Sequence, residues 1–441
     1  MTQSEKPSLY AWGVVLLLTL AYILSFVDRQ VLGMLITPIK GSLKLSDTEL
    51  GLLMGPAFAV FYVTLGWPIG WLADRTNRRN IIAVGIALWS LATAACGLSR
   101  NFTQLLFSRI SVGIGEAALT PAAMSMIADY FPKAYRPRAI SVYVMGIYLG
   151  SGLANLVGGA VIGALEEVPK IEIPVFGAIE SWQAAFLALG LPGVLVAAAF
   201  LLIREPVRRA EGQIGDRPLS FPEASRYFAT RWTAFVPICL GMCATTTIAY
   251  VAGWNFVLFQ RVWDMKVQEI GLWLGVTFLI FGPLGSATAG WLTEHWLARG
   301  RADAAYRVCF LGVGIVGAGA ALFPLMPIPA LAFLFNAIST FGSAFASAAA
   351  PTAVVGIAPA RLRAQASAIY FLIINLIGLS LGPTMVGVLT DNVFTGTAGI
   401  AAALTAVAVG AALPALAILA AGLRRYGAEV AAVSAPASKT A

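Results

Sequence analysis

The chain has 441 residues, of which 59% are hydrophobic and only 11% are charged. This composition excludes an ordinary soluble protein, because about a quarter of the residues in such proteins carry charge. It predicts an integral membrane protein. The formal net charge of +8 does not indicate a nucleic-acid partner, since the basic residues are dispersed through short loops between apolar stretches.

Twelve apolar stretches are long enough to cross a bilayer as helices, for which about 20 residues suffice. In chain order they cover residues 11–39, 50–73, 80–99, 102–131, 138–165, 181–203, 232–260, 267–293, 304–325, 328–357, 364–390 and 397–423. The first stretch is too long, and carries too much charge inside it, for a cleaved signal peptide. We therefore predict an all-α membrane protein with twelve transmembrane helices.

The 29 lysines and arginines are distributed unevenly about these stretches. Twenty-one lie on the side that carries both termini, six lie on the other side, and two, Arg29 and Arg109, lie near the middle of stretches. Because basic residues are enriched in cytoplasmic loops, both termini are expected in the cytoplasm. Short loops and alanine-rich stretches are typical of a bacterial protein, so we expect a multi-pass protein of the bacterial inner membrane.

The longest charged segment between apolar stretches covers residues 204–231, and we interpret it as a cytoplasmic linker. It separates an N-terminal six-helix bundle, residues 1–203, from a C-terminal six-helix bundle, residues 232–423, which a cytoplasmic tail over residues 424–441 follows. Within the linker, residues 225–232 are equally compatible with a short helix on the membrane surface and with a solvated loop.

Two short patterns recur in both predicted bundles. Residues 70–74 read Gly-Trp-Leu-Ala-Asp, and residues 290–294 read Gly-Trp-Leu-Thr-Glu in the equivalent loop. Two pairs with a spacing of seven residues also begin equivalent stretches, namely Arg136 with Tyr143 and Arg363 with Tyr370. Two pseudo-symmetric bundles with a central site between the repeats are typical of transporters.

Residues 70–79 read G-W-L-A-D-R-T-N-R-R, which resembles the G-x-L-x-D-R-x-G-R-K/R loop signature of the major facilitator superfamily. The glycine permits close helix approach, and the acid bonds to helix N-terminal donors and to arginines in one conformer only. We expect a cytoplasmic gate made of Gly70, Asp74, Arg75, Arg78, Arg79 and, as partner of Arg78 or Arg79, Asp129. Asn77 replaces the usual glycine, so the turn there is expected to differ. A plain positively charged loop is the alternative interpretation.

Four charges lie well away from the ends of apolar stretches, where each costs at least a few kcal/mol and indicates a functional site. They are Asp28 and Arg29 in the first stretch and Arg109 and Glu116 in the fourth. Two acids and two arginines have zero net charge, which lowers the cost of burial and keeps carboxyl protonation sensitive to neighbours. A proton-coupled carrier needs such an acid, and a static cluster of salt bridges is the alternative.

Residues 109–117 read R-I-S-V-G-I-G-E-A, which resembles the superfamily motif R-x-x-x-G-x-G-x-A. Its Arg109, Gly113 and Glu116 share one helix face. Glycines also cluster in the fifth stretch, and residues 378–383 in the eleventh read G-L-S-L-G-P, which resembles the antiporter-type element G-x-x-x-G-P. These glycines predict close packing and bending, and antiport does not follow from them alone.

Three further pairs are candidates for the lining of a central cavity, because the members of each pair are expected to share a helix face. These pairs are Tyr148 with Asn155, Tyr250 with Trp254, and Phe371 with Asn375. Interhelical packing is the alternative for each of them. Since the C-terminal half has no charge near the middle of its stretches, an amphipathic substrate fits the predicted cavity better than a sugar.

Three segments together resemble the spinster-like transporters within the superfamily. They are residues 28–29 (Asp-Arg), residues 45–47 (Leu-Ser-Asp) and residues 113–117 (Gly-Ile-Gly-Glu-Ala). The resemblance covers most of the N-terminal half and is weaker in the C-terminal half. Animal members of that family export lysosphingolipid phosphates or lysophospholipids. The resemblance implies the major facilitator fold and proton coupling through Asp28 and Glu116, with the two arginines nearby.

The chain has few residues that could form a catalytic site or bind a metal ion. The single histidine, His295, is at the end of a stretch, and all four cysteines lie within apolar stretches, so neither a metal site nor a hydrolase site is expected. The nucleotide-binding pattern G-x-x-x-x-G-K-[ST] is also missing from the sequence. We therefore expect no cofactor, with a proton gradient as the energy source.

These features predict a monomeric secondary transporter, not an enzyme, that moves an amphipathic lipid-like or drug-like molecule by alternating access. Its expected partners are that molecule, protons and the lipid bilayer, with no nucleic acid. The first alternative is an organic-anion/proton symporter in which Arg29 or Arg109 binds the carboxylate of a sugar acid. A membrane receptor or lipid scramblase with purely structural charges is the second alternative.

Overall fold

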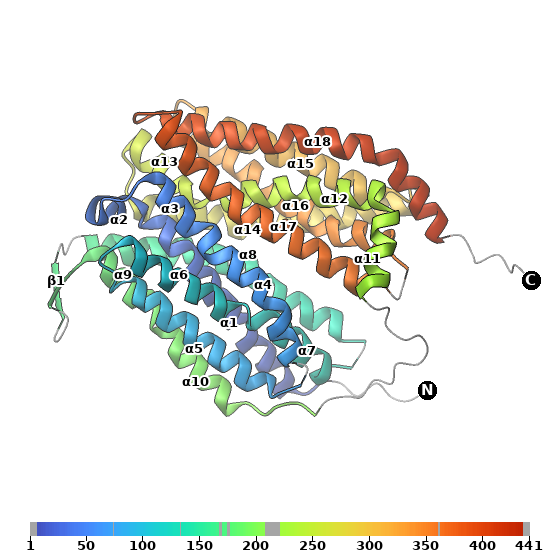
Figure 1. Ribbon diagram of the computed structural model, residues 1–441, viewed down its shortest axis with the longest axis horizontal. Coiled ribbons are helices and arrows are strands. Elements are labelled where there is room, and N and C mark those ends of the chain that lie inside the picture. The colour runs from blue at the N-terminus through green and yellow to red at the C-terminus, as the bar shows by residue number, and fades with distance from the viewer. Residues whose placement is uncertain are drawn as a thin grey trace, which may run out of the picture. The chain divides into compact units, whose positions relative to one another are not determined.

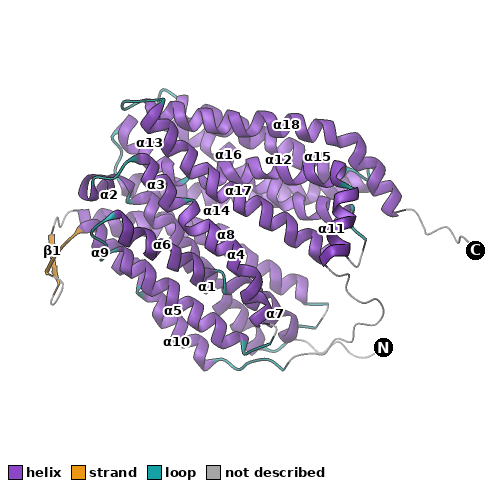
Figure 2. Ribbon diagram, in the orientation of Figure 1, coloured by secondary structure: helices purple, strands orange, loops and turns teal. Residues whose placement is uncertain are grey.

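The computed structural model describes residues 7–73, 75–132, 134–166, 170–173, 177–207, 221–359 and 362–434. Among these residues, twelve helical segments are long and apolar enough to cross a membrane. They follow the twelve predicted stretches in order, and the prediction of an all-α, twelve-span fold is confirmed. Figure 2 shows the helices together with one short two-stranded sheet.

The first six segments are formed by nine helices, which Figure 1 labels in chain order. They are α1 (Leu9–Met34), α3 (Asp47–Met54) with α4 (Pro56–Ala73), α5 (Arg78–Cys96), α6 (Phe102–Glu116) with α7 (Leu119–Tyr130), α8 (Arg136–Glu166), and α9 (Ser181–Gly190) with α10 (Pro192–Leu202). A short helix, α2 (Ile36–Leu43), connects α1 to α3. Strands β1 (Lys170–Ile173) and β2 (Gly177–Glu180) form an antiparallel hairpin before α9.

The last six segments follow α11 (Phe221–Thr230), which is too short to cross a membrane. They comprise α12 (Trp232–Tyr250) with the following α13 (Gly253–Trp263), α14 (Val267–Ala298), α15 (Ala304–Leu322) with the 3-10 turn η1 (Phe323–Leu325), α16 (Pro329–Gly356), α17 (Arg363–Asn392) and α18 (Gly399–Ser434). Helix α18 thus continues into the segment that was expected to be a tail.

Three of the first six segments are interrupted. The second breaks at Gly55 and the sixth at Leu191, and in both cases a proline begins the next helix, where its missing N–H is not needed. The fourth segment breaks after Glu116, which is the last residue of α6. The fourth-segment motif therefore ends a helix instead of lying within a continuous one.

The seventh predicted stretch, residues 232–260, is not one helix. Helix α12 ends at Tyr250, a turn follows, and α13 begins at Gly253. The prediction that Tyr250 and Trp254 share a helix face is therefore wrong. The break accompanies a close approach of α13 to α1, since a Cβ added to Gly33 would lie 2.8 Å from the Cα of Gly253.

The packing divides the chain into two compact units. Unit 1 comprises Met1–Ala210, Gly253–Leu279 and Gly387–Val393, and unit 2 comprises Glu211–Ala252, Ile280–Val386 and Phe394–Ala441. Segments from the second half of the chain, namely α13, the beginning of α14 and the end of α17, thus pack with the first six membrane segments. The units differ in this respect from a division of the chain at the predicted linker.

Unit 1 is held together by closely packed helices with small residues at their contacts. Helix α1 packs along α8, and α5 packs along α6 and α10 (Figure 1). Helix α8 approaches α14 at Gly159 and Gly271, where a Cβ on Gly271 would lie only 2.4 Å from the backbone oxygen of Asn155. The predicted close packing of the fifth-stretch glycines fits this contact.

Unit 2 has its own apolar core. Helix α15 packs against α16 and α18, and α12 packs against α18. The core contains Phe235, Tyr306, Phe345 and Tyr426, together with the buried cysteines Cys239, Cys243 and Cys309. These three cysteines are free thiols in the core, as the interpretation of apolar packing requires.

Helix α11 covers most of residues 225–232, the part of the linker for which a short surface helix and a solvated loop were equally compatible with the sequence. The segment does form a helix, which begins and ends earlier than residues 225–232, and its location on the membrane surface stays a prediction. The Tyr227 hydroxyl of α11 donates a hydrogen bond to the backbone oxygen of Ile357 at 3.0 Å. Burial raises the pKa of the Tyr227 phenol above its usual value.

Candidate functional site

An ion pair between α1 and α6 lies in the interior of unit 1. Nε of Arg29 lies 2.6 Å from Oε2 of Glu116, and the two side chains are 11% and 1% exposed. The guanidinium of Arg29 also lies over the rings of Phe26, Phe58 and Tyr62, at 5.1, 4.8 and 4.7 Å from their centroids. The first and fourth segments are therefore joined by a buried charge pair within an aromatic enclosure.

Asp28 and Arg109 lie beside this pair and are each 2% exposed. Nη1 of Arg109 donates to the backbone oxygen of Asp28 at 3.2 Å, and its Nε donates to the backbone oxygen of Leu53 at 3.4 Å. Arg109 thus holds the backbones of α1 and α3 together. The structure brings all four predicted midspan charges into one region, the midspan network: Asp28, Arg29, Arg109 and Glu116.

The two carboxyl groups of the midspan network have different surroundings. Glu116 is engaged by Arg29 through Oε2, whereas its Oε1 and the Oδ1 of Asp28 have no hydrogen-bond partner among the described residues. The polar neighbours of the Asp28 carboxyl on α5 are Trp89 and Thr93. Glu116 thus forms an ion pair through its carboxylate, whereas the Asp28 residue is bonded by Arg109 through its backbone oxygen.

We call the side of unit 1 on which α1 begins the proximal side, and the side on which α1 ends the distal side. The proximal side carries a cluster around Arg78, the first residue of α5. This arginine forms ion pairs with Asp129 of α7 and, at 2.7 Å, with Glu205, and it donates to Ser125 at 2.9 Å. Arg78 is 1% exposed. Arg78, rather than Arg79, is the partner of Asp129, and Arg78, Asp129 and Glu205 are the proximal cluster.

The other predicted gate residues make weaker contacts. The backbone N–H of Arg79 donates to Glu205 at 3.0 Å, and the Arg75 guanidinium stacks over the exposed ring of Trp71 at 3.9 Å. Gly70 has room for a methyl group, because an added Cβ would meet Pro121 at an ordinary 3.5 Å. The expected close approach at this glycine is therefore not seen in this conformation. Asp74 lies outside the described residues.

Glu205 was not among the predicted site residues. It follows α10 in the segment that the sequence marked only as a charged linker. The position of an acid directly after an arginine, at the end of a membrane segment, gave no indication of its partner. Only the packing of α10 against α5 brings it to Arg78.

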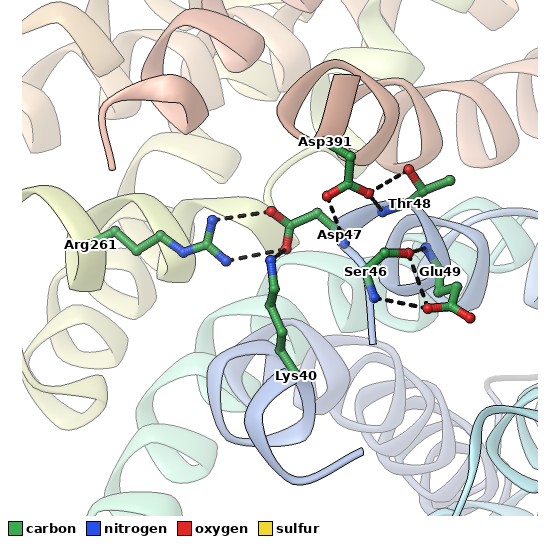
Figure 3. A network of polar contacts seen from close by, with 7 residues as sticks. All are labelled: Lys40, Ser46, Asp47, Thr48, Glu49, Arg261 and Asp391. Carbon is green, nitrogen blue, oxygen red and sulfur yellow. Dashed lines mark hydrogen bonds and ion pairs between the residues drawn. The ribbon is translucent and has the colours of Figure 1, made fainter. Parts of the chain in front are cut away.

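The distal side carries a second network that the sequence did not predict (Figure 3). Asp47, the first residue of α3, accepts two hydrogen bonds from the Arg261 guanidinium at 3.2 Å each and lies 2.6 Å from the Lys40 ammonium. Its side chain is 2% exposed. Arg261 belongs to α13, so this ion pair joins the second membrane segment to a helix from the second half of the chain.

The beginning of α3 is also bonded by Asp391, near the end of α17 (Figure 3). Its carboxylate accepts hydrogen bonds from the backbone N–H groups of Asp47 at 3.2 Å and Thr48 at 2.7 Å, and from the Thr48 hydroxyl at 2.7 Å. Ser46 and Glu49 complete the N-terminus as a capping box. That S-x-x-E pattern is readable from sequence, but it predicts only a helix start. Lys40, Asp47, Thr48, Arg261 and Asp391 are the distal network.

The predicted lining residues are divided between the units. In unit 1, Tyr148 is half-buried on α8, Trp254 is completely buried on α13, and the buried Asn155 amide donates to the backbone oxygen of Ser151 at 2.6 Å. In unit 2, Tyr250 is half-buried at the end of α12.

Helix α17 presents the remaining two lining candidates, which also belong to unit 2. Phe371 is 46% exposed, and the half-buried Asn375 donates its amide to the Phe371 backbone oxygen at 2.8 Å. Within the described part of the chain, no group of three or more His, Cys, Asp or Glu side chains is placed to hold a metal ion.

Twelve apolar helical segments, a buried charge network in the interior of unit 1 and charged networks towards both ends of that unit define a membrane transport protein. A family model described as Major Facilitator Superfamily matches residues 18–383, which is more than half of the chain. The protein belongs to the major facilitator superfamily, and within it the chain is spinster-like.

Relatives with different assigned functions are similar to this chain. An MFS-type efflux pump of Mycolicibacterium smegmatis is 29% identical over 87% of this chain and 85% of its own length. Protein spinster homolog 1 of Xenopus laevis is 28% identical over 88% of this chain and 74% of its own length. A probable L-galactonate transporter of Escherichia coli is 29% identical over 65% of this chain, and the match spans 62% of that relative, less than two thirds.

A solved structure with the same fold covers nearly the whole chain. The crystal structure of a bacterial homologue of the human lysosomal transporter spinster, in an inward-facing and unoccupied conformation, has a TM-score of 0.80. It is 29% identical and covers 97% of this chain and 98% of that one. The spinster resemblance noted in the N-terminal half is thereby confirmed.

Proposed function

We propose that this protein is a proton-coupled secondary transporter that moves an amphipathic lipid-like or drug-like molecule across the bacterial inner membrane by alternating access. The observation that carries the proposal is the midspan network, in which two acids and two arginines are buried together. Charges inside a membrane span are costly and mark ion or substrate pathways. The efflux-pump relative and the spinster relatives support an amphipathic substrate.

The two acids have separate roles in this proposal. Asp28 is the group that takes up and releases a proton, because its carboxyl is buried and its Oδ1 has no hydrogen-bond partner among the described residues. Glu116 is paired with Arg29, and an ion pair stabilises the charged form of a carboxyl group. Protonation of Glu116 therefore requires Arg29 to move, which links its proton to a conformational change.

The proximal side is the cytoplasmic side in this proposal, with both termini in the cytoplasm, since basic residues are concentrated there. The protein functions as a monomer. The proximal gate consists of the predicted Gly70, Asp74, Arg75, Arg78, Arg79 and Asp129 with the addition of Glu205. The inward-facing conformation of the similar solved structure supports a state in which the distal network is the closed gate.

Besides the midspan network, the proposed substrate-contacting residues are Tyr148, Asn155 and Trp254 of unit 1 and, on unit 2, Tyr250, Phe371 and Asn375. Exposed Phe371 gives the second half an aromatic surface, and no charged residue lies between residues 232 and 260 or between residues 364 and 390. Such a wall favours an apolar body, while the arginines favour an acidic head group. Amphipathic molecules have both features.

Reconstitution into liposomes with an imposed pH gradient tests the proposal. A lysophospholipid and a cationic dye are offered, and substrate-dependent proton flux is recorded for the parent and for Asp28→Asn. We expect the substitution to abolish coupled flux. Asp303→Asn is the matched control, because Asp303 pairs with Arg307, four residues further on, and both are far along the chain from the network. Unchanged proton flux in Asp28→Asn contradicts the assignment.

A second candidate is an organic-anion/proton symporter, which the similarity to the probable L-galactonate transporter favours. It requires Arg29 or Arg109 to bind a carboxylate. In this conformation Arg29 is engaged by Glu116 and three aromatic rings, and Arg109 by two backbone oxygens. Competition of a sugar acid at micromolar concentration with the transported substrate supports the symporter. Transport that depends neither on the pH gradient nor on Asp28 or Glu116 supports the alternative of a scramblase or receptor with structural charges.

A further inference from the structure

Helix α3 is a short helix whose first turn is bonded by residues from the second half of the chain. It has eight residues, and its first backbone N–H groups, which lack partners inside the helix, donate to the Asp391 carboxylate of α17 (Figure 3). A negative charge at this position also stabilises the helix dipole. Asp391 therefore acts as an N-terminal cap supplied by another helix.

The same turn is held by side-chain charge. Asp47 accepts a two-point contact from Arg261 of α13 and a second contact from Lys40 of α2, so the two acids and two bases of the distal network balance. The backbones also meet there, because a Cβ on Gly387 would lie 2.2 Å from the backbone oxygen of Asp47. Helices α13 and α17 cannot leave the distal side without uncapping α3 and unpairing Asp47.

The other end of α3 contacts the midspan network. Leu53 is the second-last residue of α3, and its backbone oxygen accepts the hydrogen bond from Nε of Arg109. Arg109 donates through Nη1 to the backbone of Asp28. Since a helix rises 1.5 Å per residue, the six steps from Asp47 to Leu53 put about 9 Å between the distal network and the contact with this arginine. It ends at Gly55, where the segment is interrupted before α4.

We propose that α3 is a coupling helix, which transmits the state of the distal network to the backbone contact between Arg109 and Asp28. When Arg261 and Asp391 hold its first turn, its last turn holds Arg109 against Asp28. Their release from Asp47 and Thr48 frees α3 to shift or fray, and Leu53 then withdraws from Arg109. Coupling between two sites is reciprocal, so loss of the Arg109 contact also weakens closure of the distal side.

The coupling role of α3 rests on the proposed transport function and adds a means by which the midspan network responds to closure of the distal side. The test of the coupling helix needs neither a substrate nor a proton gradient, so the coupling helix and the transport function can fail separately. A loss of coupled flux in Asp28→Asn leaves the coupling helix undecided, and an absence of coupling leaves proton transport by Asp28 intact.

Cross-linking on the distal side measures closure. The Thr37 hydroxyl lies 2.5 Å from the side-chain oxygen of Gln260, which places α2 against α13 beside the distal network. In a protein with Thr37→Cys and Gln260→Cys, oxidation forms a disulfide when the distal side is closed. The four native cysteines are buried, so they contribute little background.

Two substitutions break the cap of α3 in different ways within this cysteine pair. Asp391→Asn removes the charge of the cap, and Gly387→Ala pushes α17 away without altering any charge. We expect each to slow cross-linking about fivefold or more, as for a typical coupling between sites. Asp303→Asn and Gly290→Ala are the matched controls, since the first removes a charge from an ion pair at the beginning of α15 and the second adds a methyl group with nothing within 4 Å.

The decisive measurement uses Arg109. Arg109→Lys keeps the charge but lacks the Nε–H that binds Leu53, and we expect it to slow distal cross-linking although the residue is remote from the cysteines. Combined with Asp391→Asn, it should add little further slowing, because both act through α3. Unchanged cross-linking in Arg109→Lys, or fully additive effects in a monodisperse double variant, overturns the proposal. Recovery of the parent rate by Asp391→Glu supports it, as a carboxylate is restored.

Discussion

The proximal cluster and the distal network of unit 1 are built alike but connect different parts of the chain. Each centres on a charge that is 1% exposed, Arg78 or Asp47, and each gives that charge two partners of opposite sign. The partners of Arg78 come from the first 205 residues, whereas Asp47 is paired with Arg261 and its helix is capped by Asp391. The proximal cluster thus stabilises one bundle, and the distal network holds a contact between the two halves of the sequence.

Removal of Arg78 should have the largest effect on stability. Arg78→Ala leaves Asp129 and Glu205 without their shared partner, and breaking a buried ion pair costs about 3–5 kcal/mol. Thermal unfolding in detergent should show a marked fall in Tm, while Arg75→Ala, which loses a stacking contact and a long hydrogen bond to exposed Trp71, changes little. An equal fall in Tm for Arg78→Ala and Arg75→Ala contradicts the comparison between the two sides, because the proximal cluster then does not stabilise the fold.

Removal of Arg261 should have a smaller effect on stability and a distinct effect on conformation. In Arg261→Gln, Asp47 keeps Lys40, so the loss is that of hydrogen bonds to a charged group, about 1.5–3 kcal/mol. Cross-linking between cysteines at positions 37 and 260 should slow in this variant and stay unchanged in Arg78→Ala. Slowing by both substitutions contradicts the division of roles between the two sides.

Lys40→Ala should be milder still, because the lysine is 35% exposed and Asp47 keeps the two-point contact with Arg261. We expect a loss of about 0–1 kcal/mol that shrinks as salt is raised, since exposed pairs are screened. Unfolding curves at low and high ionic strength check this. A loss as large as that of Arg261→Gln shows that the lysine is the main partner of Asp47.

The smallest effect is expected for Arg307→Ala in unit 2. Its pair with Asp303 is an i,i+4 contact at 2.8 Å, and the arginine is 40% exposed. Such pairs contribute about 0.3–0.5 kcal/mol. This variant sets the baseline in thermal unfolding for a charge pair that joins no two helices, and an effect above that of Lys40→Ala makes the ranking wrong.

Much of the architecture was predictable from the sequence, because each membrane segment needs about 20 apolar residues and its own backbone hydrogen bonds. The twelve predicted stretches follow the observed segments, and the four midspan charges were identified because charge is so costly there. Asp129 was named as a partner of an arginine of the loop motif, and Arg78 is that arginine. Each of these inferences used local composition or a short motif.

Three features were missed for a common reason. The turn between Tyr250 and Gly253 interrupts an apolar stretch without a proline or a charge, Glu205 was part of a charged segment, and Asp391 was an ordinary acid at the end of a span. In each case the determining contact is with a helix distant in the sequence. Periodicity and composition contain no information about such a partner.

The sequence by itself determined that this is a twelve-span membrane protein with its buried charges in the first and fourth segments. The physical reason is that a polar or charged group without a bonding partner is costly inside a bilayer. Only the tertiary structure decided which charges meet. It paired Arg29 with Glu116, placed Arg109 on the backbones of Asp28 and Leu53, and brought Arg261 and Asp391 to the beginning of α3. Ion pairs and helix caps depend on distances of about 3 Å between side chains, and those distances are set by how the helices pack.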